Sequence, residues 1–360
     1  MVDVAVVGAG IVGLSTAFAL QRRGAAVTVL ESGQPGGGQS AGRGRIFRHA
    51  HDDARLVAQV VRSRALWREW EEDLGVELVA PDGAVAIGDG VPDKLATLAQ
   101  FPDAPARPLS RAELRERLPV LADYDGPAML DVHGGAIRTR AAITALSERL
   151  APETDHVLAV RRRDDGSVEV RTGTSVRTFD HVVLAAGRGT AALAGALGME
   201  LSVDLGAHVR LTYEVADPAG PLPTFQDGSG DFGESGVYAS PYEGSEHFGV
   251  GLSDFTAARP DGAVAQPEEL AALADRTTAY VRRALPGLRP DPVDVVHCFV
   301  TALPWGEDGV GVWTQDGVTV VAGHNLFKQA PVLGAALATT ALTGAIPDDW
   351  SHAQRLGRAG

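Results

Sequence analysis

DVAVVGAGIVGLSTAFALQRRGAAVTVLE, residues 3–31, is the stretch that decides the fold of this chain. Its β-branched run at 4–7 predicts a strand. Apolar spacing over 11–23 predicts a helix that Gly24 ends, and residues 26–30 predict a second strand. This order of strand, glycine turn, helix and strand is typical of a Rossmann-like βαβ unit.

The glycines of this unit, and an acid at the end of its second strand, favour a dinucleotide as ligand. Gly8 permits the turn, Gly10 lets the backbone approach a pyrophosphate, and Gly13 lets helix and strand pack closely. The free N–H groups and the dipole of the helix N-terminus attract the pyrophosphate. Glu31 is placed to accept hydrogen bonds from ribose hydroxyls. The motif leaves FAD and NAD open, and a packing turn without ligand is the alternative.

The rest of the chain alternates in character. Helices are expected over 53–75, 139–150, 267–284 and 331–343, strands over 156–161, 167–171, 176–179, 181–187 and 318–323, a hairpin around 81–83, and an antiparallel sheet over 204–255. We therefore expect an α/β fold (α+β overall) with two interleaved domains. The cofactor-binding Rossmann-like domain takes residues 1–80, 139–203 and 290–360, and an antiparallel-sheet substrate domain takes 81–138 and 204–289.

The bulk composition excludes several classes of partner. The chain has 360 residues and a net charge of −14, which disfavours nucleic acid and anionic membrane surfaces and leaves small molecules. Its single cysteine, Cys298, excludes an intramolecular disulfide, and no charged segment precedes the apolar start as in a secretory signal. We expect a cytoplasmic protein without a metal site, since no spacing of His, Cys, Asp and Glu is typical of one.

Six segments together resemble a known family. They are GAGIVGLSTAFALQRRGAAVTVLES (8–32), RGRIFRHAH (43–51), HVVLAAGRGTAALAGALG (181–198), GVYASPYE (236–243), HCFVT (297–301) and VTVVAGHNLFKQAPVLGAALATTALTG (318–344). In this order they resemble FAD-dependent amine oxidoreductases of the D-amino-acid oxidase superfamily, and most of all the monomeric sarcosine oxidase and N-methylamino-acid oxidase branch. The resemblance implies FAD as cofactor and the oxidation of an amine to an imine.

Three basic residues carry the chemistry that the resemblance implies. Arg45 and Arg48 are three residues apart, and helical spacing would put them on one side. In the related oxidases the first lies against the flavin ring and the second binds the substrate carboxylate. Lys328 is one of two lysines in a chain with 30 arginines, and it matches the lysine that completes this clamp. The alternative is a solvated basic run and an exposed loop lysine.

The resemblance implies further contacts. His51 and Tyr238 are expected beside the substrate with Arg48 and Lys328. The FAD contacts are expected from Gly8, Gly10, Ile11, Val12, Gly13, Glu31, Ser40, Arg45, Val160, Ala186, Gly187, Cys298, Gly323, Phe327 and Lys328. Cys298 stands where this branch carries a cysteine bound to the flavin through a thioether. Its alternative role is that of a small buried hydrophobic residue.

One departure from the family concerns the electron acceptor. The oxidases carry a second lysine, over the other flavin face, in the segment that reads SEHFGVGLSD (245–254) here, and Gly249 takes its place. The remaining lysine, Lys94, lies in a polar stretch, and His247 is a candidate substitute. We therefore expect weak reactivity with O₂ or another acceptor. A hydroxy-acid dehydrogenase, or a flavin-binding protein without efficient turnover, remains an alternative to the amine oxidoreductase.

Overall fold

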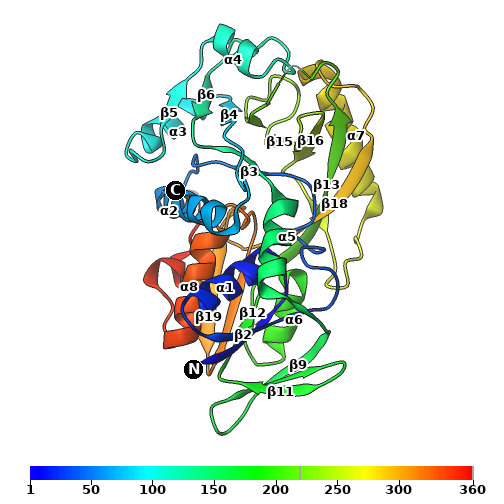
Figure 1. The fold of residues 1–360 in the computed structure, drawn as a ribbon. Helices are drawn as coiled ribbons and strands as arrows, with labels where there is room; N and C mark the ends of the chain where they lie inside the picture. The colour runs from blue at the N-terminus through cyan, green and yellow to red at the C-terminus, as the bar shows by residue number, and fades with distance from the viewer. Residues whose placement is uncertain (219, 359–360) are drawn as a thin grey trace.

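The computed structural model describes residues 1–218 and 220–358, which form two large sheets with helices around them. Figure 1 shows the first sheet with α1 and α8 in the lower half of the molecule, and the second sheet with α7 in the upper half. The chain crosses between the halves several times. The expected mixed α/β architecture is therefore confirmed.

The first sheet is built around the N-terminal βαβ unit. Its strand order is β19 (Val310–Gln315), β20 (Val318–Gly323), β12 (His181–Leu184), β1 (Asp3–Val7), β2 (Ala26–Glu31) and β8 (Glu153–Thr154). All neighbouring strands are parallel except β19 and β20. Both faces of the sheet are covered, which explains the continuous apolar runs of its central strands.

Two helices pack closely on this sheet because one glycine leaves no side chain between the helices and another leaves none between helix and turn. α1 (Ile11–Arg22) begins after Gly10, and α8 (Ala330–Thr343) ends at Gly344 in a left-handed conformation. A Cβ on Gly13 would overlap the carbonyl oxygen of Gly8, and a Cβ on Gly334 would come 2.6 Å from the backbone of Ser15. The third glycine of the motif thus packs helix against turn, as predicted.

The second sheet is mostly antiparallel. Its strand order is β17 (Thr256–Ala257), β13 (Asp204–Glu214), β16 (His247–Leu252), β15 (Val237–Pro241), β14 (Thr224–Asp227), β4 (Ala84–Ile87), β6 (Ala128–Asp131) and β5 (Ala106–Pro108), and β18 (Asp294–Ala302) also pairs with β13. Only β14 and β4 are parallel neighbours. α7 (Pro267–Ala284) covers one face, where Tyr213, Phe225 and Tyr280 belong to the largest apolar core.

The remaining elements connect and flank the two sheets. They are the paired strands β3 (Arg45–Phe47) and β7 (Gly135–Ile137), the helices α2 (Ala54–Leu74), α3 (Val91–Leu98), α4 (Arg111–Arg117), α5 (Thr139–Leu150) and α6 (Thr190–Gly195), and a small sheet of β9 (Val157–Arg162), β10 (Val168–Thr172) and β11 (Val176–Phe179). α2 agrees with its prediction, since the side chain of Asp53 caps its start and Gly75 ends it. Among the described helices, none has the length and apolar character needed to cross a membrane.

Three sequence-based expectations were wrong. The turn at 81–83 does not close a hairpin, because β4 pairs with β6 and β14 while Val79 bridges to Ile137. Arg45 and Arg48 do not share a helix, because Arg45 begins the strand β3. The antiparallel sheet extends beyond the expected residues 204–255, because β18, in the segment 290–360 assigned to the cofactor-binding domain, pairs with β13 along its whole length. In each case the deciding partner lies far away in the sequence.

Candidate active site

A cavity of about 1020 Å³ runs from the N-terminal glycine turn to the second sheet. Its walls come from the turn after β1, the segment 37–48, the turn after β12, the strands β13, β15 and β18, and the segment 321–328. Pockets for small molecules range from about 300 to 1,000 Å³, so this one has room for a dinucleotide-sized ligand. Gly8, Gly10, Ile11, Val12, Glu31, Ser40, Arg45, Arg48, Ala186, Gly187, Tyr238, Cys298, Gly323, Phe327 and Lys328 all line it.

The end of the cavity at α1 combines a helix N-terminus, which attracts anions, with the carboxylate of Glu31, which accepts hydrogen bonds. The backbone at Gly8 has φ +104°, and a Cβ there would come 2.5 Å from the carbonyl oxygen of Ala185. The first turn of α1 contains no acidic residue, and the Ile11 N–H donates to Ser40 Oγ at 2.9 Å. The carboxylate of Glu31 is fixed by the N–H groups of Ala9 and Gly33, at 2.8 and 2.9 Å. This geometry suits a pyrophosphate on the helix and a ribose at Glu31.

The segment 324–329 places Lys328 through contacts with α2. Ser63 Oγ and Trp67 Nε1 both donate to the carbonyl oxygen of Lys328, at 2.6 and 3.0 Å. The indole of Trp67 also stacks on the ring of Phe327, at 6.3 Å between centroids. These contacts fix the backbone of Lys328, and the backbone in turn sets the direction in which its side chain extends.

Lys328 and Arg48 meet at a carboxylate that the sequence analysis missed. Arg48 Nη2 lies 3.2 Å from Asp308 Oδ2, and Lys328 Nζ lies 3.4 Å from Asp308 Oδ1. His51 Nδ1 is 2.8 Å from Oδ2, and Asn325 Nδ2 donates to Oδ1 at 2.8 Å. We call Arg48, His51, Asp308 and Lys328 the Asp308 cluster. The two predicted clamp residues do converge, but on a carboxylate of the chain itself.

The protonation states of this cluster follow from burial and from its charges. Burial lowers the pKa of Lys328 to about 8 despite the attraction of Asp308, and Arg48 contributes to the lowering. Burial, with Arg48 and Lys328, lowers the pKa of His51 to about 3, so its neutral ring donates Nδ1–H to Asp308. Although burial acts in the opposite direction, Lys328, His51 and Arg48 hold the pKa of Asp308 well below its usual range.

A second pair of basic side chains, Arg45 and Arg210, lines the cavity, and the part of the chain that the structure describes offers neither of them an ion pair with a carboxylate. Arg45 donates to the carbonyl oxygens of Gln39, Ala41 and Gly44, at 3.3, 2.6 and 3.3 Å. Arg210, on β13, donates to Gly44 O at 2.9 Å, and its guanidinium lies 5.3 Å from the ring centroid of Tyr238. We call these two residues the arginine pair.

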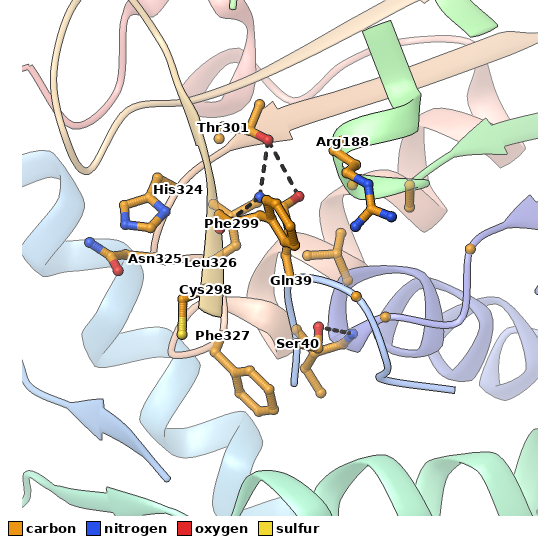
Figure 2. A pocket seen from close by; sticks show the side chains of 18 of the residues that line it. Gln39, Ser40, Arg188, Cys298, Phe299, Thr301, His324, Asn325, Leu326 and Phe327 are labelled. Carbon is orange, nitrogen blue, oxygen red and sulfur yellow. Dashed lines mark hydrogen bonds between the residues drawn. The ribbon is translucent and has the colours of Figure 1, made fainter. Parts of the chain in front are cut away.

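Cys298 lies on β18 beside His208 of β13, and both residues line the cavity. Figure 2 shows Cys298 with the segment 324–327 around the pocket, and Gln39 reaching Thr301 and the backbone of Phe299. Burial lowers the pKa of His208 to about 3, with Arg210 and Arg45 adding to the effect. Burial and His208 lower the pKa of His324 to about 3. Both imidazoles are therefore neutral at neutral pH.

The structure corrects several site expectations. Val160 does not line the cavity, because its side chain packs in the apolar core of β9 and β10, and residues 155–158 border the cavity instead. His51 is a buried partner of Asp308 rather than a wall residue. His247 pairs with Glu214 and does not reach the cavity, whereas Lys94 does line it.

The residues that were missed had weak signals in the sequence. Asp308 is 260 residues from Arg48, and nothing local marks either as a partner. Arg210 and His208 alternate along β13 with apolar residues, a pattern that predicts a solvent-facing side for both, whereas the structure buries them. The alternation over 204–255 was interpreted as a half-exposed antiparallel sheet, so it gave no sign that Arg210 and His208 lie in the interior.

The comparisons with known proteins agree with this geometry. The model of the FAD dependent oxidoreductase family, DAO, matches residues 3–340. An uncharacterized oxidoreductase of Bacillus subtilis (strain 168), YurR, is 28% identical over an alignment of 239 residues, which covers 59% of this chain and 59% of the relative. An open form of a variant of NikD, described as an unusual amino acid oxidase essential for nikkomycin biosynthesis, superposes with a TM-score of 0.84, with 23% identity and coverage of 99% and 97%.

Two further solved structures share the fold. The L-proline dehydrogenase from P. horikoshii has a TM-score of 0.81 at 18% identity, with coverage of 96% and 94%. The glycine oxidase from Geobacillus kaustophilus has a TM-score of 0.77 at 21% identity, with coverage of 97% and 96%. Since the family match spans almost the whole chain and the cavity has the features of a dinucleotide site, this protein belongs to the FAD-dependent oxidoreductase family DAO.

Proposed function

We propose that the protein oxidises a primary or secondary amine of an amino acid, an N-methylamino acid or a related small metabolite to an imine. FAD supplies the hydride acceptor, at N5 of the flavin ring, and the protein supplies orientation and charge. Oxidases and dehydrogenases of amino acids are among the solved structures with this fold. The fold alone does not select the substrate, so the proposal rests on the site.

The observation that carries the proposal is the way Arg48 and Lys328 hold a carboxylate. They approach the two oxygens of Asp308 from different sides, at 3.2 and 3.4 Å. A guanidinium fork and an ammonium placed in this way are suited to a carboxylate group. A substrate carboxylate that joins or replaces Asp308 would therefore be oriented from the same two sides.

The residues present fit FAD at the other end of the cavity. The N-terminus of α1 would hold the pyrophosphate, Glu31 the ribose hydroxyls, and Ala186 and Gly187 the adenosine side. The ring would lie toward Arg45, Cys298 and the segment 323–328. We also propose a thioether between Cys298 and the flavin, as the resemblance implies; the thiol and a methyl group of the ring would each lose a proton, and the oxidised ring would take up the two electrons. We further propose a cytoplasmic location, in which this thiol would stay reduced until it reacts.

The charges around the substrate would favour the reactive form of an amine. Loss of a hydride from the carbon next to nitrogen requires an uncharged amine. Arg48, Lys328 and the arginine pair line the cavity and disfavour an ammonium, so they would lower the pKa of the bound amine. The cavity histidines His208, which is buried, and His324, which is half-buried, are poor bases because the pKa of each is about 3.

The electron acceptor is a separate part of the proposal. Gly249 provides no side chain at its position on β16, where the related oxidases carry the second lysine. A Cβ at this position would come 2.7 Å from Tyr242 Oη. We propose that the protein reacts weakly with O₂ or uses another acceptor. Reduced protein mixed with air should reoxidise slowly when followed by flavin absorbance. Reoxidation at a rate typical of oxidases would contradict this part.

The function is tested by reduction of the bound flavin without oxygen. A panel of primary amines, N-methylamino acids and hydroxy acids is mixed with the protein, and the loss of flavin absorbance is followed. Reduction by amino acids supports the proposal. Reduction by hydroxy acids alone would replace it with a hydroxy-acid dehydrogenase, for which the same clamp would serve. Reduction by none would favour a flavin-binding protein without efficient turnover.

A further inference from the structure

Arg210 is buried and Arg45 is half-buried, and among the described residues neither forms an ion pair with a carboxylate. Arg210 is only 6% exposed, and both guanidinium groups line the cavity. Their hydrogen bonds go to the backbone carbonyl oxygens of Gln39, Ala41 and Gly44. Within residues 1–218 and 220–358, no carboxylate lies within 4.0 Å of either group. Two like charges are thus placed side by side in the interior.

The surroundings of the pair do not neutralise it. The nearest acidic side chains are the thiol of Cys298 and the phenols of Tyr238 and Tyr242, rather than carboxylates. Burial, with the neighbouring Arg210, lowers the pKa of Arg45 to about 10, so it stays charged at neutral pH. Buried charges of one sign are costly unless an anion with suitable hydrogen-bond geometry joins them. The cavity beside them is where such an anion can enter.

The backbone of β16 makes room for this arrangement. Gly251 is the cross-strand neighbour of both Arg210 and Tyr238. A Cβ on Gly249 would come 3.1 Å from Arg210 Cδ, and a Cβ on Gly251 would overlap the hydroxyl of Tyr238. The two glycines therefore leave the space through which Arg210 reaches the cavity. The fold therefore leaves a preformed space for the Arg210 guanidinium beside the cavity.

We propose that Arg45 and Arg210 form a second anion-binding subsite in the cavity, separate from the Asp308 cluster, which takes one delocalised negative charge. Two groups supply a negative charge of this kind: a carboxylate of the substrate, and the flavin ring of FAD once it is reduced. The proposal rests on the proposed function only for the choice between these sources. Binding of a simple carboxylate, and chemical reduction of the flavin, require no substrate turnover.

The test measures both sources on the holoprotein with Arg210→Met, and with Arg210→Gln, which keeps a hydrogen-bond donor for Gly44 O. Acetate is titrated into the oxidised protein while flavin absorbance is followed, in a Lys328→Met background that weakens the other carboxylate site. The midpoint potential of the flavin is measured separately by reduction with dithionite. Arg188→Met is the control, because Arg188 also lines the cavity but contacts Phe299, at 4.8 Å from its ring centroid.

A substrate-side subsite predicts at least about tenfold weaker acetate binding in both Arg210 variants. A flavin-side subsite predicts unchanged acetate binding and a midpoint potential lower by about 30 mV or more, which is tenfold in the two-electron equilibrium. Arg210→Lys should restore part of either effect, and Arg188→Met should cause neither. If both Arg210 variants bind acetate within twofold of the parent and keep its potential, the pair is structural and the proposal is wrong.

Discussion

Two pairs of basic side chains face the same cavity, and only one of them comes with its own anion. Arg48 and Lys328 enclose Asp308 at 3.2 and 3.4 Å, whereas Arg45 and Arg210 have only carbonyl oxygens and weak acids around them. Before any ligand enters, one negative charge offsets half of the positive charge of the first pair. No carboxylate of the described residues offsets that of the second pair.

The difference indicates two ways of preparing a site for an anion. Asp308 keeps the Asp308 cluster ordered and stable, but a substrate carboxylate must share or replace its contacts. The arginine pair has no competitor, so an incoming anion gains the full interaction, and the folded protein bears the repulsion until then. Changing the balance of either pair should therefore trade stability against anion affinity.

Asp308→Asn should give the largest effect, since it makes the Asp308 cluster resemble the arginine pair. Breaking a buried ion pair destabilises by about 3–5 kcal/mol, and we expect about 2–3 kcal/mol here because the Asp308 side chain is 17% exposed. Acetate should bind more tightly, because its internal competitor is gone. Urea unfolding and acetate titration of the holoprotein measure the two effects.

Asp349→Asn is the matched control for this prediction. Asp349 pairs with Arg62 at the surface, with side chains 63% and 56% exposed, so its loss should change stability by less than about 0.5 kcal/mol. Equal stability of Asp308→Asn and the parent, with unchanged acetate binding, would show that Asp308 does not balance the clamp.

Gly249→Ala tests whether Arg210 needs the space that the glycine leaves on β16. Its Cβ would come 2.7 Å from Tyr242 Oη and 3.1 Å from Arg210 Cδ, and Tyr242 Oη is held 3.1 Å from Thr212 Oγ1. Displacing these groups should destabilise the protein by about 1–3 kcal/mol. Gly195→Ala is the control, since that Cβ meets nothing within 4 Å. A Gly249→Ala protein as stable as Gly195→Ala would mean that Arg210 has room to spare.

The comparison also marks what the sequence could and could not predict. The βαβ unit was predictable because its glycines act within a few residues of one another, and α2 and α8 because their caps are local. The convergence of Arg48 and Lys328 came from the family resemblance. Asp308 and Arg210 were missed because their partners lie on other elements, so only the folded chain brings them together.

Lys328→Met should weaken acetate binding by about tenfold at pH 7 and leave the flavin content unchanged. Lys94→Met is the control, because Lys94 lines the same cavity but makes no ion pair with Asp308. Loss of flavin with unchanged acetate affinity would assign Lys328 to the cofactor instead.

The pH dependence sharpens this prediction. Asp308, Arg48 and Glu307 are the charged groups near Lys328, and burial gives it a pKa of about 8. Its ammonium is present below that pH, so acetate affinity should be constant from about pH 6 to 8 and fall above it by about tenfold in total, to the affinity of Lys328→Met. Stability changes in the opposite direction. Because the folded pKa lies below the ordinary 10.5, the unfolded chain binds more protons above pH 8, and the parent gains stability relative to Lys328→Met.

Cys298→Ser should have the smallest effect on stability, less than about 1 kcal/mol, because the residue is small and its neighbours stay in place. It tests which cation pair the flavin ring lies against. Cys298 is opposite His208 on β13, two residues from Arg210, so a thioether there would fix the ring on the side of the arginine pair. After acid precipitation the parent should keep its yellow colour in the pellet, and Cys298→Ser should release it to the supernatant. A colourless parent pellet would exclude the thioether and leave the buried thiol as a packing residue. In that case no covalent bond would hold the flavin ring beside the arginine pair, and an anion there would be held by charge and hydrogen bonds alone.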